Sequence, residues 1–217
     1  MQAGVAPRAL TISHAKKADL AAVFAFHLRR AQESEYLWPR DYSRFSDLVE
    51  ARQVFIVKDG ATVVGLSYLA NEIDQEWEFG GVFVEDESRG LGIAAALGRV
   101  AISTLYLFDQ PESLIAHVHE FNNAPRNLLV NQLGFNPTDE QLVAPPEAPQ
   151  NMKRNAEGDV VGDIFRFEPA RLADFADWFE SFDGTLSGQA GEALLTLNVD
   201  IWKNRGVLMP ALRDRAS

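Results

Sequence analysis

Residues 78–108 read EFGGVFVEDESRGLGIAAALGRVAISTLYLF, and this stretch decides the fold. It predicts a strand, a short acidic turn, a glycine-bearing loop that Arg89 enters, and a buried helix. Gly90 and Gly92 let the backbone turn tightly and approach a ligand closely. The helix that follows offers unpaired N–H groups and the positive end of a dipole at its start. Such a loop is a seat for a phosphate or a pyrophosphate, although the same residues also suit an ordinary strand–helix connection.

Two patterns compete for this loop. Gly90, Gly92 and Ala95 match the G-x-G-x-x-A of a dinucleotide site. That site places its first glycine directly at a strand end in the first βα unit, whereas an acidic turn intervenes here. Arg89, Gly92 and Ala94 match R/Q-x-x-G-x-G/A after an apolar strand that ends V-F-V. This second pattern resembles the pyrophosphate loop of the GNAT superfamily, the acyl-CoA-dependent N-acyltransferases.

A second signature of the same family follows downstream. It consists of an asparagine before a helix that ends in L-G-F, and its residues here are Asn123, Ala124, Leu129, Leu133, Gly134 and Phe135. The resemblance covers roughly residues 10–167. It implies an α/β (α+β) fold in which a mixed, mostly antiparallel sheet with splayed central strands is flanked by helices, within a domain of residues 1–169. Residues 170–217 lie outside it, and their Trp, Phe and Leu content predicts a helical C-terminal extension that packs on the domain or on a second subunit.

The resemblance also implies acetyl-CoA as a co-substrate. Gly80 and Gly81 within the central strand indicate a bulge or a close ligand approach. In this family such a bulge splays the sheet, so that the pantetheine arm pairs like an additional strand. The residues implied in binding, largely through their backbone, are Val82, Phe83 and Val84 for the acyl carbonyl and pantetheine, Arg89, Gly90, Leu91, Gly92, Ile93 and Ala94 for the pyrophosphate, and Asn123 for the pantetheine.

Acyl transfer from a thioester to an amine needs a group that removes a proton from the amine. Glu78, on the central strand, matches the strand glutamate that serves as base in the histone-acetylating branch of the family. Glu76 lies on the same face at the two-residue period of a strand and is the reserve candidate. Both residues also suit exposed edge carboxylates without a catalytic role.

The chain departs from the family at the general acid. Many members have a tyrosine that protonates the departing thiolate, and this chain has Val130 at that position. Either the thiolate leaves unaided or another residue helps. His117 and His119 share one face of the neighbouring strand, and histidine is the side chain suited to proton transfer near pH 7, although packed or surface histidines are the simpler interpretation. The pair has the spacing of two metal ligands, but no third ligand pattern accompanies it, so no metal is expected.

In this fold the acceptor pocket lies beside the loop between the first two helices. The candidates there are Glu33 and Glu35, which suit a cationic amine, the aromatic residues Tyr36, Trp38 and Tyr42, and, on the central strand, Glu76. Aromatic loop residues are equally often plain packing. We expect the pocket to accept a primary amine of a small molecule or a peptide.

Composition limits the partners. The 217 residues carry a formal net charge of −11, which argues against nucleic acid as a partner and mildly favours cationic substrates. The absence of cysteine excludes disulfides and Cys-ligated zinc. The start of the chain shows no signal-peptide pattern, and the apolar stretch 91–108 has Arg99 at its centre, so a buried helix explains it better than a membrane span. We therefore expect a soluble, cytoplasmic protein with no membrane partner, and the apolar tail makes a homodimer an open alternative.

Three further local predictions follow from the pattern. His27 falls on the apolar face of a helix at 18–31, which predicts a buried histidine that is satisfied in the core. Residues 136–149 are polar and rich in proline, which indicates a loop. The tail has helix candidates at 170–182 and 191–203, separated by a glycine-rich break.

Together these observations favour an acetyl-CoA-dependent N-acetyltransferase that works by direct attack in a ternary complex, with Glu78 as the base. Because Val130 replaces the tyrosine, a non-catalytic acyl-CoA-binding module is the main alternative. A nucleotide-binding oxidoreductase, resting on Gly90 and Gly92 alone, is a third interpretation. It predicts binding of NAD(P) and no binding of acetyl-CoA.

Overall fold

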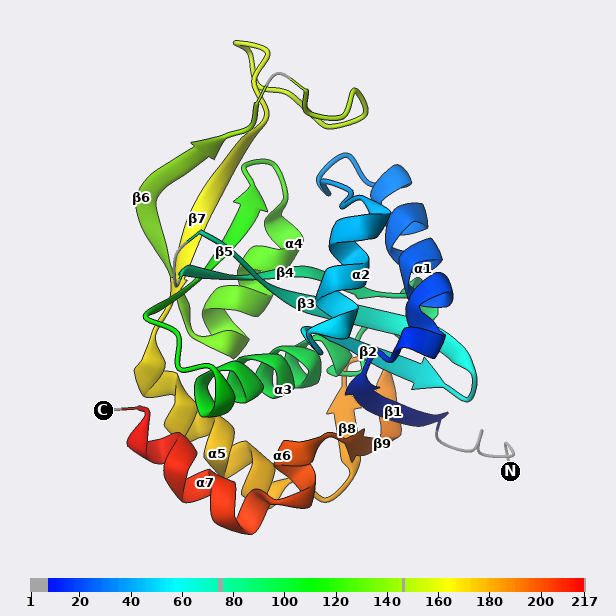
Figure 1. Ribbon diagram of the computed structural model, residues 1–217, viewed down its shortest axis with the longest axis vertical. Coiled ribbons are helices and arrows are strands. Elements are labelled where there is room, and N and C mark those ends of the chain that lie inside the picture. Colours follow the sequence, from blue (N-terminus) through cyan, green and yellow to red (C-terminus); the bar gives the residue numbers. More distant parts are fainter. Residues whose placement is uncertain (1–7, 74–75, 146, 217) are drawn as a thin grey trace.

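The computed structural model describes residues 8–73, 76–145 and 147–216, and in these ranges the chain builds one nine-stranded sheet with helices on both faces (Figure 1). The order across the sheet is β6-β7-β5-β4-β3-β2-β1-β9-β8. The strands are β1 (Arg8–His14), β2 (Val54–Asp59), β3 (Thr62–Ile73), β4 (Glu76–Val84), β5 (Ser113–His119), β6 (Phe135–Val143), β7 (Val161–Phe167), β8 (Thr185–Gly188) and β9 (Gly191–Asn198).

The sheet is mixed and mostly antiparallel, as the resemblance implied. Among the described strands, β4 with β5 and β1 with β9 run parallel, and the other neighbours run antiparallel. Parallel neighbours need a crossover connection. For β4 and β5 the buried helix at the centre of the chain supplies it, and for β1 and β9 most of the chain intervenes.

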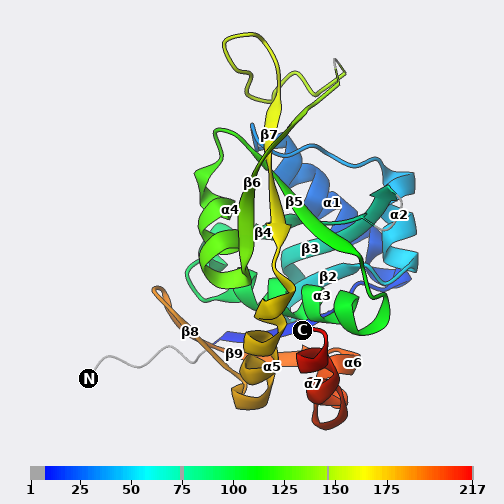
Figure 2. The same ribbon diagram turned by 90° about the vertical axis from the view of Figure 1, so that its left-hand side faces the viewer.

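The helices form two layers. On one face lie α1 (Leu20–Gln32) and α2 (Tyr42–Glu50), which pack on β2 and β3 through Val23, Phe45, Ile56 and Leu66. The helices of the other face are α3 (Ile93–Phe108), α4 (Asn123–Leu128), α5 (Leu172–Ser181), α6 (Asp200–Lys203) and α7 (Arg205–Asp214). Short turns of helix occupy η1 (Lys17–Asp19), η2 (Asp86–Ser88), η3 (Leu129–Leu133) and η4 (Pro169–Arg171). Figure 2 shows α5 and α7 side by side beneath α3.

The central helix α3 is buried along most of its length, which explains its apolar sequence. Gly98 lies where a Cβ atom would be 2.5 Å from Leu133, so the absence of a side chain lets η3 pack directly on α3. No helix in the described ranges combines the length and apolar character needed to cross a membrane. Gly134 ends η3 in a left-handed conformation, as a C-cap glycine does.

The sheet opens at its centre, between β4 and β5. These two strands pair over Glu76–Glu78 and Ser113–Ile115, and the ladder ends there. On the other side of β4, the register with β3 shifts between Leu66 and Tyr68, so that β4 has one extra residue at Gly81 and Val82. This is the bulge that Gly80 and Gly81 predicted. Beyond Glu78, β4 and β5 separate, and the β5-facing edge of Gly80–Val84 pairs with no described strand.

The predicted loop at 136–149 was wrong over its first part, because β6 occupies Phe135–Val143. This strand lies at the edge of the sheet, has β7 as its neighbour and is mostly exposed. Its sequence therefore lacks the alternation of apolar residues that marks a half-buried strand. Pro137 is tolerated because one side of an edge strand needs no N–H donors.

The predicted helix at 191–203 was wrong over residues 191–198 and holds only for its last turn. Residues Gly191–Asn198 form β9, and the helix α6 begins at Asp200. Ala193, Leu195 and Leu197 are buried at every second position, which is the period of a strand. Pairing with β1 on one side and β8 on the other overrides the helical propensity of Ala, Leu and Glu. The C-terminal extension therefore contains helices and, in addition, a hairpin that continues the sheet.

Candidate active site

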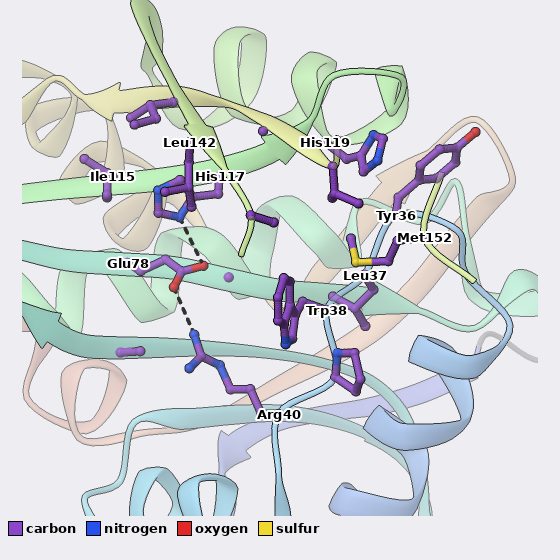
Figure 3. Close-up of a pocket in the computed structure, with 18 of the residues that line it drawn as sticks. Tyr36, Leu37, Trp38, Arg40, Glu78, Ile115, His117, His119, Leu142 and Met152 are labelled. Carbon is purple, nitrogen blue, oxygen red and sulfur yellow. Dashed lines mark hydrogen bonds and ion pairs between the residues drawn. The ribbon is translucent and has the colours of Figure 1, made fainter. Parts of the chain in front are cut away.

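A pocket of about 730 Å³ lies at the point where β4 and β5 separate (Figure 3). Its walls come from the α1–α2 loop, the central strands and the segment that joins β6 to β7. The lining includes Tyr36, Trp38, Arg40, Tyr68, Glu76, Glu78, His117, His119 and Met152. The lining is mostly apolar and carries a few charged groups at one end, which is typical of a small-molecule site.

Glu78 is the last residue of the β4–β5 ladder, and its carboxylate lies between two cationic or ionisable groups. Arg40 donates to its Oε2 at 2.9 Å, and Nδ1 of His117 lies 3.7 Å from its Oε1. Figure 3 shows the two partners on opposite sides of the carboxylate. Burial alone would raise the pKa of Glu78, but the adjacent His117 and Arg40 outweigh it and hold the pKa below its ordinary value. Glu78 is therefore ionised at neutral pH and able to accept a proton.

Tyr68 and the two glycines of the bulge form the floor beside Glu78. A Cβ atom on Gly81 would lie 2.2 Å from the Tyr68 ring, and one on Gly80 would lie 2.9 Å from it. Gly81 also has a φ of +59°, which L side chains rarely adopt. The Arg40 guanidinium stacks over the same ring at 4.7 Å. The glycines thus give Tyr68 room to pack, and Tyr68 in turn helps to hold the Arg40 that contacts Glu78.

The two histidines of β5 differ in what surrounds them, although both line the pocket. Nε2 of His119 lies 2.7 Å from the Lys153 carbonyl oxygen, and the Phe121 N–H donates to its Nδ1 at 3.2 Å. Both ring nitrogens are therefore engaged, with the proton on Nε2, and the residue is buried. His117 instead faces Glu78. The sequence paired these residues by spacing, and the structure gives them separate environments.

Some of the predicted acceptor-site residues line the pocket and others do not. Tyr36 and Trp38 line the pocket, as does Glu76, whose Oε1 lies within 3.4 Å of Ser113 and Arg166 side chains. The carboxylate of Glu33 accepts from Arg30 at 2.8 Å and is absent from the pocket lining. Glu35 and Tyr42 are likewise absent from the lining.

The α1–α2 loop is fastened to the segment between β6 and β7. The Lys153 N–H donates to the Glu35 carbonyl at 2.9 Å, and the Asn151 amide donates to the Ser34 carbonyl at 3.0 Å. The Tyr36 ring packs on His119 at 5.2 Å. These contacts bring together two distant parts of the sequence, both of which line the pocket.

The glycine loop has the backbone that a phosphate seat requires. Gly90 and Gly92 have φ values of +75° and +82°, and α3 begins immediately after Gly92. The first N–H groups of α3 have no acceptor within the helix. The Arg89 N–H donates to the Asp86 carbonyl at 3.2 Å, so the available donors of this loop follow Arg89. Val82–Val84, the end of β4, lies on the edge that β5 leaves open, and the glycine loop and the first turn of α3 follow it in the chain.

The second signature also has a defined place. Asn123 is exposed at the start of α4, and Val130 is 40% exposed on η3. No hydroxyl is available at Val130, as the sequence indicated. In the described ranges, no group of three His, Asp or Glu side chains is arranged to hold a metal ion.

Sequence reasoning missed Arg40 and Tyr68. Arg40 lies in an irregular loop, and no spacing rule connects it to Glu78 across 38 residues. Tyr68 had a weak signal, since a large aromatic residue on β3 opposite Gly80 on β4 is a typical partner for a glycine in a strand. His27 is buried, as predicted, and its Nε2 accepts from the Arg40 N–H at 3.1 Å, which fixes the backbone that carries Arg40. The prediction that it is fully satisfied was wrong, because its buried Nδ1 has no hydrogen-bond partner among the described residues.

No family model matches the sequence, and no curated protein matches it. Solved structures do match the fold. A putative acetyltransferase from Salmonella typhimurium, solved with acetyl-CoA, has a TM-score of 0.58 and 20% identity over 73% of this chain and 92% of its own. A ribosomal-protein-alanine N-acetyltransferase from Brucella melitensis has a TM-score of 0.57 and 21% identity over 71% of this chain and 97% of its own. A GNAT-family acetyltransferase from Streptococcus pneumoniae has a TM-score of 0.58 and 14% identity over 72% of this chain and 98% of its own. The chain therefore has the fold of the GNAT superfamily of acyl-CoA-dependent N-acyltransferases.

Proposed function

We propose that this protein transfers the acetyl group of acetyl-CoA to a primary amine, with Glu78 as the general base. The observation that carries the proposal is the position of Glu78. It is an ionised carboxylate at the last rung of the β4–β5 ladder, and it faces a pocket of about 730 Å³. A base for an incoming amine has to stand between an acceptor pocket and the place where the thioester lies, and the position of Glu78 at the opening supports this role.

The residues on the other side of the opening fit acetyl-CoA. The unpaired edge of Gly80–Val84 offers backbone donors and acceptors to a pantetheine amide, because a strand edge pairs readily with an extended chain. The positive-φ glycines and the start of α3 suit a pyrophosphate. The Salmonella structure, which contains acetyl-CoA, supports this co-substrate for a chain of the same fold. Asn123, at the start of α4, is proposed to bond the pantetheine.

The proposed reaction needs few groups. The lone pair of the neutral amine forms a bond to the acetyl carbon, whose C=O electron pair moves to the oxygen, and the ionised carboxylate of Glu78 accepts the one proton that the nitrogen gives up. The carbonyl then re-forms, the carbon–sulfur bond breaks, and its electron pair leaves with the thiolate. Because Val130 carries no hydroxyl, the thiolate leaves without an acid at that position, which is tolerable since thiols ionise at pKa values of about 8.5.

The pocket favours an amine with an apolar body. Tyr36, Trp38 and Met152 provide apolar walls, whereas Glu76 and Glu78 provide negative charge at one end. An ammonium group directed to the carboxylates with its apolar portion against the aromatic rings satisfies both features. The volume of about 730 Å³ suits a small molecule or a short peptide.

The test combines binding with turnover. Acetyl-CoA should raise the melting temperature and bind with a Kd of micromolar order, and NAD should do neither. Release of CoA should then depend on an added amine from a panel of aromatic and aliphatic primary amines. Absence of acetyl-CoA binding contradicts the proposal. Binding without amine-dependent release of CoA identifies an acyl-CoA-binding module instead.

A further inference from the structure

The tip of the β8–β9 hairpin lies directly against the glycine loop. The Ala190 N–H donates to the Gly90 carbonyl at 3.1 Å. An added Cβ atom on Gly90 would be 3.0 Å from the Ala190 Cβ, and one on Gly92 would be 3.7 Å from the Ser187 carbonyl oxygen. The contact thus joins the C-terminal extension to the loop that precedes α3.

This hydrogen bond fixes the orientation of one peptide plane. The described chain contains no cis peptide bond, and in a trans peptide the C=O and the following N–H point in opposite directions. Because the Gly90 carbonyl points at the hairpin, the Leu91 N–H points away from it. The opposite side of the loop is where the remaining N–H donors before α3 are available to an anion.

Gly188 makes the contact close. A Cβ atom at this position would lie 2.0 Å from the Gly90 carbonyl oxygen and 2.9 Å from its carbonyl carbon. Both neighbours are backbone atoms, so the clash cannot be relieved by rotating a side chain. A residue other than glycine at position 188 therefore has to displace the loop or the hairpin.

The sheet holds the hairpin in place. β9 pairs with β1 from Arg8↔Ala193 to Ser13↔Asn198, and Leu186, Ala193 and Leu91 are buried in one core. Figure 1 shows the hairpin, in orange, beside β1 at the edge of the sheet. Arg8 of β1 adds a second clamp, because its Nη1 donates to the Glu87 carbonyl and the Ser88 hydroxyl, each at 2.9 Å. The hairpin and Arg8 therefore both hold the segment that precedes α3.

We infer that the β8–β9 hairpin is a positioning element for the pyrophosphate of acetyl-CoA, and that Gly188 and the Ala190 N–H hold the Gly90–Leu91 peptide with its N–H directed at the phosphates. The inference rests on the proposed function. It assigns a role in co-substrate binding to the extension, and it explains the glycine-rich break before β9.

The experiment compares Gly188→Ala with Gly206→Ala and uses two acetyl donors. Gly206 lies in α7, where an added Cβ meets nothing within 4 Å. The donors are acetyl-CoA and S-acetylpantetheine, which carries the same thioester without the pyrophosphate.

Loss of one hydrogen bond to a charged group corresponds to about a tenfold to hundredfold loss of affinity. Gly188→Ala should therefore raise the Kd of acetyl-CoA, and lower kcat/KM for it, by about tenfold or more. With S-acetylpantetheine as the donor, the kcat/KM of Gly188→Ala should change less than about twofold. Gly206→Ala should leave kcat/KM unchanged for both donors.

The outcomes separate this inference from the proposed function. If the wild-type protein binds and turns over acetyl-CoA and Gly188→Ala does so equally well, or better, the inference is wrong and the proposed function stands. An equal loss for both donors also overturns it, because that result indicates a general structural defect. If the wild-type protein does not bind acetyl-CoA, the inference and the proposed function are both wrong.

A second measurement covers the case in which Gly188→Ala does not fold. In the wild-type protein, hydrogen exchange at residues 187–192 should slow on addition of acetyl-CoA and stay unchanged with S-acetylpantetheine. Slowing by both donors, or by neither, contradicts the inference.

Discussion

Replacing Glu78 by Gln tests the central residue of the proposed site with the smallest change of shape. The amide retains an oxygen that can accept from Arg40, whose Nη2 donates to the carboxylate at 2.9 Å. It removes the negative charge and with it the capacity to accept a proton from the amine. The expected effect is therefore large on turnover, moderate on stability and small on co-substrate binding.

The magnitudes follow from the surroundings of the carboxylate. Loss of a general base lowers kcat by about 10²–10⁴-fold, which is about 3–5 kcal/mol of barrier. Glu78 is 23% exposed and Arg40 13% exposed, so the lost attraction is only partly screened by water. Because the hydrogen bond to Arg40 can persist, we expect a loss of about 1–3 kcal/mol of unfolding free energy. The Kd of acetyl-CoA should change less than about twofold, since its proposed contacts are backbone groups of β4 and the glycine loop.

Glu76→Gln is the matched control. Glu76 lies on the same strand two residues earlier, lines the same pocket and also contacts an arginine, Arg166, at 3.4 Å. It pairs with Ser113 at the first rung of the β4–β5 ladder, two rungs before Glu78 and therefore away from the opening. The assay is the initial rate of CoA release with the best amine of the panel, together with the Kd of acetyl-CoA by calorimetry. We expect Glu76→Gln to change kcat less than about threefold.

Two results would refute this reasoning. A decrease of kcat below about tenfold for Glu78→Gln means that the carboxylate is not the base. If His117→Gln then shows the larger decrease, the imidazole beside Glu78 accepts the proton and Glu78 only orients it. A comparable loss in Glu76→Gln means that the charge of the pocket matters and not the position of one carboxylate.

Three further changes test the pocket, the bulge and the buried histidine. Trp38→Ala should raise the acceptor KM by about tenfold and leave the Kd of acetyl-CoA unchanged, and the reverse pattern in kinetics and calorimetry would exclude Trp38 from the acceptor site. Gly81→Ala should destabilise the protein by roughly 2–4 kcal/mol, because the new Cβ meets the Tyr68 ring at a positive φ; thermal melts should show a fall of roughly 5–15 °C, and an unchanged melting temperature would contradict the packing described. Burial lowers the pKa of His27 to about 4, so the unfolded chain binds a proton at higher pH than the folded one. Stability from this residue is present above the unfolded pKa of about 6.5 and is lost as the pH falls towards 4, by about 3 kcal/mol in total. Denaturant titrations from pH 7 to pH 4 should show this slope, and His27→Gln should flatten it.

Local sequence signals were sufficient for the central part of the fold. The strand at 76–84, the glycine loop and α3 follow from an apolar run, two glycines and a second apolar run. β5 was likewise bounded by clear turn residues. In each of these elements the hydrophobic pattern and the turn residues at its ends indicate the same secondary structure. The structure of these elements therefore does not depend on one particular distant partner.

The parts that the sequence did not reveal depend on distant partners. β9 alternates Ala193, Leu195 and Leu197 with exposed residues, but these residues are also helix formers, and the parallel pairing with β1 decides between the two. In the site, Glu78 was accessible to prediction because a motif fixes its distance from the glycine loop. Arg40 was not, because its contact with Glu78 depends on how an irregular loop is fastened by His27 and by the segment at 151–153.

The central strand shows why the open edge and the glycines belong together. An unpaired strand edge invites association with other chains, and folded proteins usually shorten, charge or cover it. In this chain the open edge of Gly80–Val84 lies inside the sheet and faces β5, which pairs with β4 only as far as Glu78. The other edge of β4 pairs with β3. Two adjacent glycines weaken a strand, and here Tyr68 packs against both, so the bulge is stabilised by a specific side chain. The two glycines and the open edge both lower the free energy of unfolding, and neither helps the chain to fold. We propose that the benefit is an extended ligand paired with the open edge, whose reactive end would reach the pocket beside the ionised Glu78 at the last rung.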